Sequence, residues 1–150
     1  MAEDPAGRAR RIVDEGFYMT LATADADGVP WASPVWYAPE SPRSLLWISD
    51  PGARHSRNIE ARPQIGIVIF DSRQAPGTGK GVYFEATAER VAEAELEAAV
   101  AVFSERSLQR GDSGLELARV QAPAPSRMYR ATALRIYFGE HDERTEVSLG

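Results

Sequence analysis

The tetrapeptide Asp25-Ala26-Asp27-Gly28 restricts the fold of this chain more than any other feature of its sequence. An Asp-Gly pair tolerates the positive φ values that tight hairpin turns require. Residues 18–23 alternate like a strand before the tetrapeptide, and residues 29–37 return as a strand after it. The pattern therefore predicts an antiparallel hairpin and favours an antiparallel sheet over the parallel sheet of a wound α/β fold.

The rest of the chain continues with apolar strand-like segments divided by turn residues. Further strands are predicted at residues 44–49, 64–70, 80–92 and 128–138, with a turn at 39–43 and a loop at 71–79. Helical spacing predicts one substantial helix at 93–109, and shorter helices at 9–15 and 56–61. About six antiparallel strands with one substantial helix indicate a mainly β (α+β) fold, built as a small closed or partly closed barrel. The polar residues 139–150 are expected to form a loose tail.

Length and composition limit the classes of function. At 150 residues the chain fits one domain, expected to span residues 1–150, and its net charge of −5 argues against a broad nucleic-acid surface. The absence of cysteine excludes disulfides, thiolate nucleophiles and cysteine-based metal sites. His141 lies in the expected tail, so no metal site is predicted. The polar N-terminus has no stretch of signal-peptide or membrane-span length, so we expect a cytoplasmic protein with no membrane partner.

The strongest candidate for a binding site is the segment 49–59, which follows the strand predicted at 44–49. Ser-Asp-Pro-Gly ends that strand, and Arg54, His55 and Arg57 follow at a predicted helix start. Free backbone N–H groups and the helix dipole favour an anion there, and guanidinium groups bind phosphate through charge-assisted hydrogen bonds. These residues predict a site for a small anionic ligand, with a solvated surface cluster as the alternative reading.

Six segments, taken in order, match one known family. They are residues 21–23 (Leu-Ala-Thr), 27–30 (Asp-Gly-Val-Pro), 32–37 (Ala-Ser-Pro-Val-Trp-Tyr), 46–49 (Leu-Trp-Ile-Ser), 53–59 (Ala-Arg-His-Ser-Arg-Asn-Ile) and 80–91 (Lys-Gly-Val-Tyr-Phe-Glu-Ala-Thr-Ala-Glu-Arg-Val). Through these segments the chain resembles the pyridoxamine 5′-phosphate oxidase-like flavoproteins, which have the FMN-binding split β-barrel fold. The order and spacing of the segments make the match more specific than any one of them alone.

The resemblance implies a homodimer that holds FMN in the groove between its subunits. It implies that Ser49, Arg54 and His55 hold the cofactor phosphate at the strand-to-helix junction, and that Asn58 packs this junction. A homodimer is also expected on physical grounds, because a small barrel with this many aromatic residues has more apolar strand surface than one core can bury.

The same resemblance implies a second set of residues near the flavin ring. The backbone of one strand edges the isoalloxazine ring and a basic residue opens the next long strand; in this chain these residues are Ser33, Pro34, Val35 and Lys80. The tryptophans are expected to fill the core or the dimer interface rather than to stack on a flavin. They are Trp31, Trp36 and Trp47.

Three departures from the family pattern bear on the function. His55 stands where the family usually has lysine, so its charge depends on protonation. Gly81 replaces a side chain that reaches the flavin in the true oxidases. The C-terminal Trp and Arg motif that recognises the pyridoxal substrate is missing from residues 139–150. We therefore do not expect vitamin B6 oxidation.

The sequence thus predicts an FMN-dependent oxidoreductase that acts on an unidentified small molecule, in which the cofactor carries out hydride or electron transfer. No catalytic side chain is predicted. The deazaflavin coenzyme F-420 is the alternative cofactor, because the arginine-rich, lysine-poor composition suits a high-GC actinobacterium. Two other readings are a non-catalytic module that binds flavin or haem, with His55 as the axial haem ligand, and a structural dimer with a degenerate site.

Overall fold

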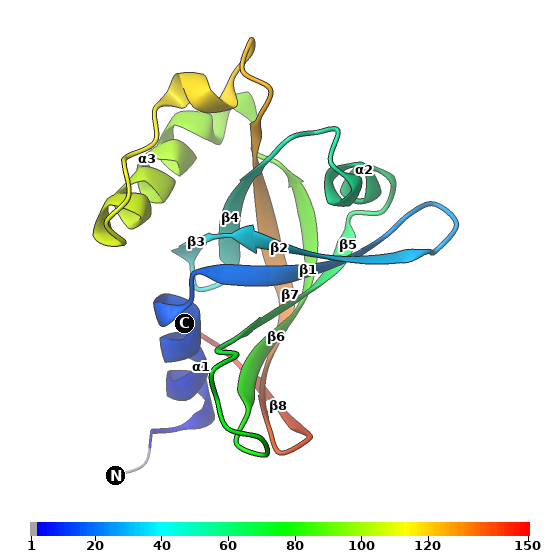
Figure 1. The fold of residues 1–150 in the computed structure, drawn as a ribbon, viewed down its shortest axis with the longest axis vertical. Helices are drawn as coiled ribbons and strands as arrows, with labels where there is room; N and C mark the ends of the chain where they lie inside the picture. Colours follow the sequence, from blue (N-terminus) through cyan, green and yellow to red (C-terminus); the bar gives the residue numbers. More distant parts are fainter. Residues whose placement is uncertain (1–2) are drawn as a thin grey trace.

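A curled antiparallel sheet of eight strands forms the body of the protein (Figure 1). The computed structural model describes residues 3–150. The elements in chain order are α1 (Pro5–Glu15), β1 (Tyr18–Ala24), β2 (Pro30–Trp36), β3 (Ala38–Ser41), β4 (Ser44–Ser49), α2 (Arg54–Ala61), β5 (Gln64–Phe70), β6 (Lys80–Arg90), α3 (Glu93–Gln109), the 3-10 helix η1 (Leu117–Val120), β7 (Arg127–Glu140) and β8 (Glu143–Val147).

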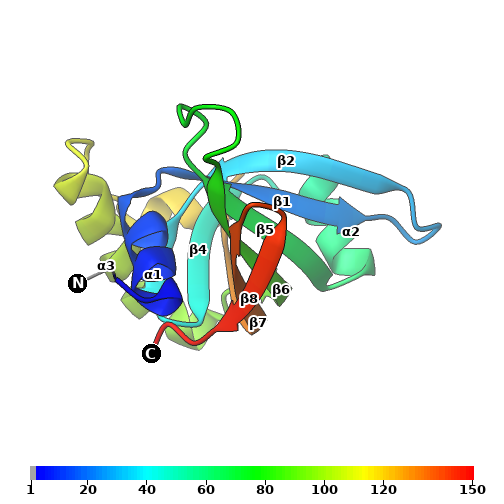
Figure 2. The same ribbon diagram turned by 90° about the horizontal axis from the view of Figure 1, so that it is seen from below.

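The strand order is β2-β1-β5-β6-β7-β4-β3, and every pairing is antiparallel. The long strand β7 pairs with β6 along one edge, and on its other edge it pairs first with β4 and then with β8. Figure 2 shows the curl of the sheet from below. The predicted mainly β (α+β) antiparallel fold is confirmed.

Two apolar cores lie on opposite faces of this sheet. The barrel core fills the concave side and includes Leu21, Trp47, Ile67, Phe84, Tyr129 and Ile136. The α3 core lies between α3 and the strands β4 and β7, and includes Leu46, Leu96, Val100, Phe103, Val120 and Met128. Strand residues alternate between the two cores because successive side chains of a strand point to opposite faces. Among residues 3–150, no helix combines the length and apolar character needed to cross a membrane.

Two glycines hold positions that other residues would not accept. Gly28 has a φ of 84° in the turn between β1 and β2, as the Asp-Gly signal predicts. A Cβ at Gly16 would lie 2.4 Å from the Tyr37 hydroxyl, which donates a 2.6 Å hydrogen bond to the carbonyl of Val13. Gly16 therefore lets α1 end directly against the wall of the barrel.

Two strands were not expected from the sequence. Residues 38–41 form β3, although Pro39 indicated a turn, because an edge strand can place a proline where no N–H is needed. Residues 143–147 form β8, so the expectation of a loose tail at 139–150 is wrong. His141 and Asp142 have positive φ values in the turn that returns the chain to β7. Leu149 is only 6% exposed and packs on the barrel core.

The helices fall close to their expected positions. The expected bounds of α3 are correct, whereas α2 begins two residues and α1 four residues earlier than predicted. Asp4 caps α1 by accepting a 2.7 Å hydrogen bond from the N–H of Gly7, and Pro5 occupies the first turn, where its missing N–H costs nothing.

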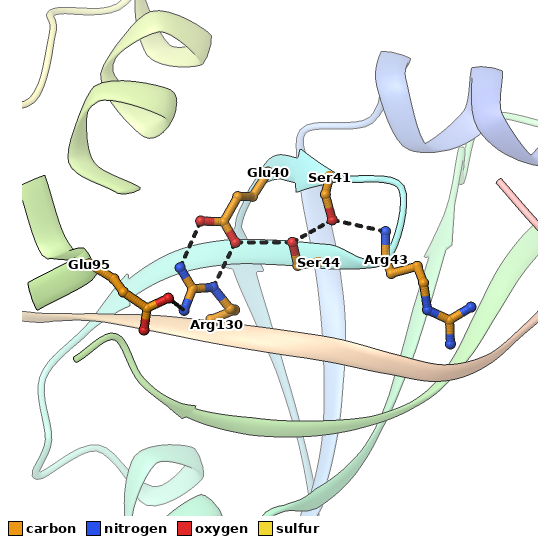
Figure 3. Close-up of polar contacts among 6 residues, drawn as sticks. All are labelled: Glu40, Ser41, Arg43, Ser44, Glu95 and Arg130. Atoms are coloured by element: carbon orange, nitrogen blue, oxygen red, sulfur yellow. Dashed lines mark hydrogen bonds and ion pairs between the residues drawn. The ribbon is translucent and has the colours of Figure 1, made fainter. Parts of the chain in front are cut away.

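A largely buried ion pair ties the edge hairpin β3–β4 to the central strand β7 (Figure 3). Arg130 donates to the two carboxylate oxygens of Glu40 over 2.6 and 2.8 Å, and the two side chains are only 13% and 20% exposed. The Ser44 hydroxyl donates to the same carboxylate over 3.0 Å, and Glu95 of α3 adds a longer contact of 3.4 Å to Arg130. The hydrogen bonds from Arg130 hold the pKa of Glu40 below its ordinary value.

We predict that Glu40→Gln lowers the free energy of unfolding at neutral pH by about 2 to 3 kcal/mol, because it leaves Arg130 without its main counter-charge. Since the pKa of Glu40 is depressed in the folded state, this stabilisation is present above the unfolded pKa and is lost as pH falls through the folded pKa. Urea denaturation at neutral and acid pH should show the variant and the wild type converging in acid. An equal difference at both pH values would contradict the assignment. Glu95→Gln, at a more exposed contact, is the control and should cost less than about 1 kcal/mol.

Candidate functional site

The segment from Ser49 to Asn58 forms a corner between the end of β4 and the start of α2, which we call the junction. Its turn is closed by hydrogen bonds from Gly52 N–H to the Asp50 carboxylate (2.7 Å) and from Ala53 N–H to the Asp50 carbonyl (3.0 Å). Ala53 is the N-cap of α2 and has no side chain that could bond to the first turn. The N–H groups of that turn are therefore free of a side-chain cap, as an anion site requires.

Ser49 and His55 face each other across the junction. The Ser49 hydroxyl lies 2.7 Å from Nε2 of His55, and the tautomer of the ring decides which atom donates. The imidazole is half-buried, and burial lowers its pKa below the ordinary value of 6.5. His55 is therefore mainly neutral at pH 7, and it offers an anion hydrogen bonding without a full positive charge.

The guanidinium group of Arg54 lies over the indole ring of Trp31, with its carbon 4.2 Å from the ring centroid. Within residues 3–150, no carboxylate lies within ion-pair distance of Arg54. The nearby Asp25 carboxylate has a lowered pKa, chiefly because it accepts the N–H of Val29, with a smaller contribution from the charge of Arg54. The junction thus presents an arginine that makes no direct ion pair with a carboxylate among the described residues.

The sequence did not indicate the contact between Arg54 and Trp31. Trp47 is fully buried in the barrel core, and Trp36 meets Phe103 edge-on at 5.0 Å, so both fill cores as expected. Trp31 instead is 41% exposed on β2. The contact joins residues 23 positions apart in different elements, and neither local spacing nor composition carries such a signal.

Asn58 is buried and fixes α2 to the sheet. Its amide nitrogen donates a 3.0 Å hydrogen bond to the hydroxyl of Thr23 on β1, and that hydroxyl donates over 3.4 Å to the carbonyl of Trp31 on β2. The residue thus packs the junction, while direct contact with a cofactor stays a prediction.

Ser33, Pro34 and Val35 lie on the same strand as Trp31. Strand β2 is an edge of the sheet and pairs only with β1, so its other side is free to approach a ligand. Val35 is buried, Ser33 is partly exposed and Pro34 is exposed. The junction and the proposed ring-binding strand are therefore adjacent, connected through Trp31 and Arg54.

Lys80 is the one predicted site residue that lies apart from the junction in this chain. It opens β6 opposite Glu140, whereas the other end of β6, Arg90, pairs with Tyr129 near the junction. The strand has 11 residues, so its ends are about 33 Å apart at about 3.3 Å per residue.

A hollow of about 460 Å³ opens near the N-terminal end of α3. Its other walls are the end of β6, the end of η1 and the start of β7. Its lining combines the apolar Leu96, Val120 and Met128 with the charged Arg90 and Arg127. Arg127 pairs with Ser49 in the sheet, so the hollow lies beside the junction.

Comparison with known proteins places this geometry in a wider group. The family model described as pyridoxamine 5′-phosphate oxidase matches residues 6–139 of the chain. A search of curated proteins found no match. Among solved structures, a heme binding protein from Mycobacterium smegmatis superposes with a TM-score of 0.77 at 22% identity, over 99% of this chain and 59% of that one. The chain thus spans less than two thirds of that protein.

Two further solved structures are similar over most of their own length. HutZ, the heme storage protein from Vibrio cholerae, superposes with a TM-score of 0.68 at 24% identity, covering 89% of this chain and 95% of HutZ. The conserved hypothetical protein Rv2991 from Mycobacterium tuberculosis gives 0.73 at 21% identity, covering 94% and 87% of the two chains. At these identities the likeness shows a shared fold.

The protonation of His55 generates a prediction about stability. Because burial lowers the folded-state pKa of His55, its contribution to stability is complete above the unfolded value of 6.5 and is lost as pH falls from there toward the folded value. Replacing His55 by Gln should therefore destabilise the protein more at about pH 8 than at about pH 5. Chemical denaturation of both proteins at the two pH values measures this difference, and a larger effect at the lower pH would show that His55 is charged in the fold.

Proposed function

Because the chain belongs to the pyridoxamine 5′-phosphate oxidase family, we propose that it is a flavin-dependent oxidoreductase whose junction holds the phosphate of FMN. The observation that carries the proposal is Arg54, which is fixed at the start of α2 without a carboxylate partner. Next to it lie the uncapped N–H groups of α2 and the hydroxyl and imidazole of Ser49 and His55. Phosphate oxygens would accept hydrogen bonds from Arg54, from the N–H groups of α2, and from whichever of Ser49 and His55 is not the donor in their mutual hydrogen bond.

A bound flavin would supply the hydride or electron transfer, and the chain would supply binding, orientation and shelter from water. The free edge of β2 at Ser33, Pro34 and Val35 would then border the ring, because these residues follow Trp31, the β2 residue that contacts Arg54. The substrate would be a small molecule. The deazaflavin coenzyme F-420 is the alternative cofactor, and titration with both ranks them.

Oxidation of pyridoxamine phosphate is not proposed. The family motif of Trp and Arg has no counterpart in residues 139–150. The arginine of that segment, Arg144, lies over the ring of Tyr83 at 4.2 Å and donates to its hydroxyl over 3.1 Å. Arg144 is thus engaged by Tyr83 on the outer side of the sheet.

We further propose that two copies of the chain pair through the outer sheet face, defined here by Thr20, Ala22, Gly66, Val68 and Tyr83. These residues are uncharged, and strand pairing sets them side by side on β1, β5 and β6. Their chain neighbours are buried in the barrel core, so they point outward. Two charged residues border them, since Glu85 lies opposite Gly66 and Arg144 lies over the ring of Tyr83. The position of Lys80 supports a second copy of the chain as the partner of this face. Lys80 lies at the end of β6 that is far from the junction, so it cannot reach the junction of its own chain.

Haem is the second candidate ligand. Two similar solved structures are described as heme binding and heme storage proteins. In this chain, the neutral imidazole of His55 has the protonation state that axial ligation needs. Ligation through Nε2 would require the ring to leave Ser49, which lies 2.7 Å away. The phosphate role asks for no such rearrangement.

Purification under native conditions, followed by absorbance and mass spectrometry of the bound small molecule, distinguishes these functions. We expect the visible absorbance of a flavin, or fluorescence quenching when FMN is added to the apo protein. Replacing Arg54 by Gln should weaken FMN binding about tenfold or more, because a charge-assisted hydrogen bond contributes about 1.5–3 kcal/mol. A Soret band that disappears in His55→Ala, together with no flavin binding, would establish haem instead.

The dimer is tested by sedimentation equilibrium. The wild type should sediment with about twice the chain mass of 16.4 kDa, and Val68→Glu should reduce this to the mass of one chain. A carboxylate on the outer sheet face would be buried without a partner in the dimer. Leu108→Glu, on an exposed position of α3, is the control and should remain dimeric. A monomeric wild type would contradict the proposal.

A further inference from the structure

We propose that Trp31 is a positioning residue that aims Arg54 at an anion, and that this pair makes the site prefer a phosphorylated flavin to the same flavin without phosphate. The inference rests on the proposed function, since it concerns the phosphate of that ligand. It assigns a role to a tryptophan that neither core contains.

The geometry of the stack leaves the donors of Arg54 available. A guanidinium group carries five N–H donors in its plane, and a ring that lies against its face occupies none of them. Arg130 shows the opposite arrangement, because Glu40 takes two of its donors and compensates its charge. Arg54 therefore keeps both its charge and its donors while its orientation is restricted.

Both partners of the stack are attached to the same framework. The hydrogen bonds from Asn58 to Thr23, and from Thr23 to the carbonyl of Trp31, join α2 to β1 and β2 at this level. Farther along α2, Arg62 donates to the carbonyls of Asp25 (2.7 Å) and Ala26 (3.0 Å) and holds the β1–β2 turn against the helix. The backbone of Trp31 thus has a fixed place relative to the backbone of Arg54.

This arrangement reduces the cost of binding an anion. A long, exposed arginine loses side-chain entropy when a ligand orders it. When the arginine is already stacked on Trp31 before binding, less of this entropy remains to be lost on binding. Only a ligand whose phosphate contacts Arg54 gains from this smaller entropy cost. A flavin with a phosphate should gain from Trp31, and riboflavin should not.

The experiment measures the dissociation constants of FMN and riboflavin by flavin fluorescence or calorimetry for wild type, Trp31→Leu, Trp31→Phe and Arg54→Gln. We expect Trp31→Leu to weaken FMN binding about three- to tenfold and Trp31→Phe to weaken it less, since the strength of cation–π contacts follows the ring. Riboflavin binding should change less than about twofold in all variants. In the Arg54→Gln background, Trp31→Leu should have no further effect, because the two residues act as one unit.

Arg119→Gln is the matched control, because Arg119 is an exposed arginine of η1 that takes part in neither stacking nor ion pairs among the described residues. It should alter FMN binding less than about twofold. Thermal unfolding checks that each variant folds, and the exposed position of Trp31 favours this.

Three results would overturn the inference. Trp31→Leu and Trp31→Phe could bind FMN as the wild type does, or Trp31→Leu could weaken FMN and riboflavin equally, which would place the indole against the flavin ring. The losses in Trp31→Leu and Arg54→Gln could also add independently. If the wild type binds no flavin, the proposed function itself fails, and the wild-type titration reveals this before any variant is compared.

Discussion

The pairing of β7 with three other strands is the constraint on which the rest of the structure depends. One edge of β7 pairs with β6, while the other edge serves β4 and then β8. This brings the end of β4 beside the start of β7, so the junction sits next to Arg127 and the hollow beneath α3. The ion pair of Glu40 and Arg130 stabilises this pairing from the side of the edge hairpin. The position of the candidate site is thus a consequence of strand register.

Much of this architecture follows from local sequence patterns. The bounds of β4, β5 and α3 agree with the apolar and helical spacing of their residues, and Gly28 supplies the expected hairpin turn. The pattern is weaker where strands are short, polar or contain proline. Strands β3 and β8 each form a hairpin with the strand next to them in the chain, and this pairing, rather than the strand propensity of their own residues, makes them strands.

The candidate site shows the same division. The strand end, the turn and the arginine at the helix start could be predicted, because each is a local feature with a known preference for anions. The stack of Arg54 on Trp31 and the bond from Asn58 to Thr23 could not, because both depend on how α2 lies against β1 and β2. The remote position of Lys80 likewise follows from the pairing of β6 with β7 rather than from its own neighbours.

The free edges of the sheet also influence how this molecule meets its neighbours in a crowded solution. Strand β2 carries Pro30 and Pro34, and strand β3 carries Pro39, so both outermost strands lack some of the N–H groups that an extended foreign chain would need for continuous pairing. Strand β8 is short and bears Glu143, Arg144 and Glu146. Stray strand addition, the first step of amyloid-like growth, is therefore discouraged at every exposed border, and association is directed to surfaces made of side chains.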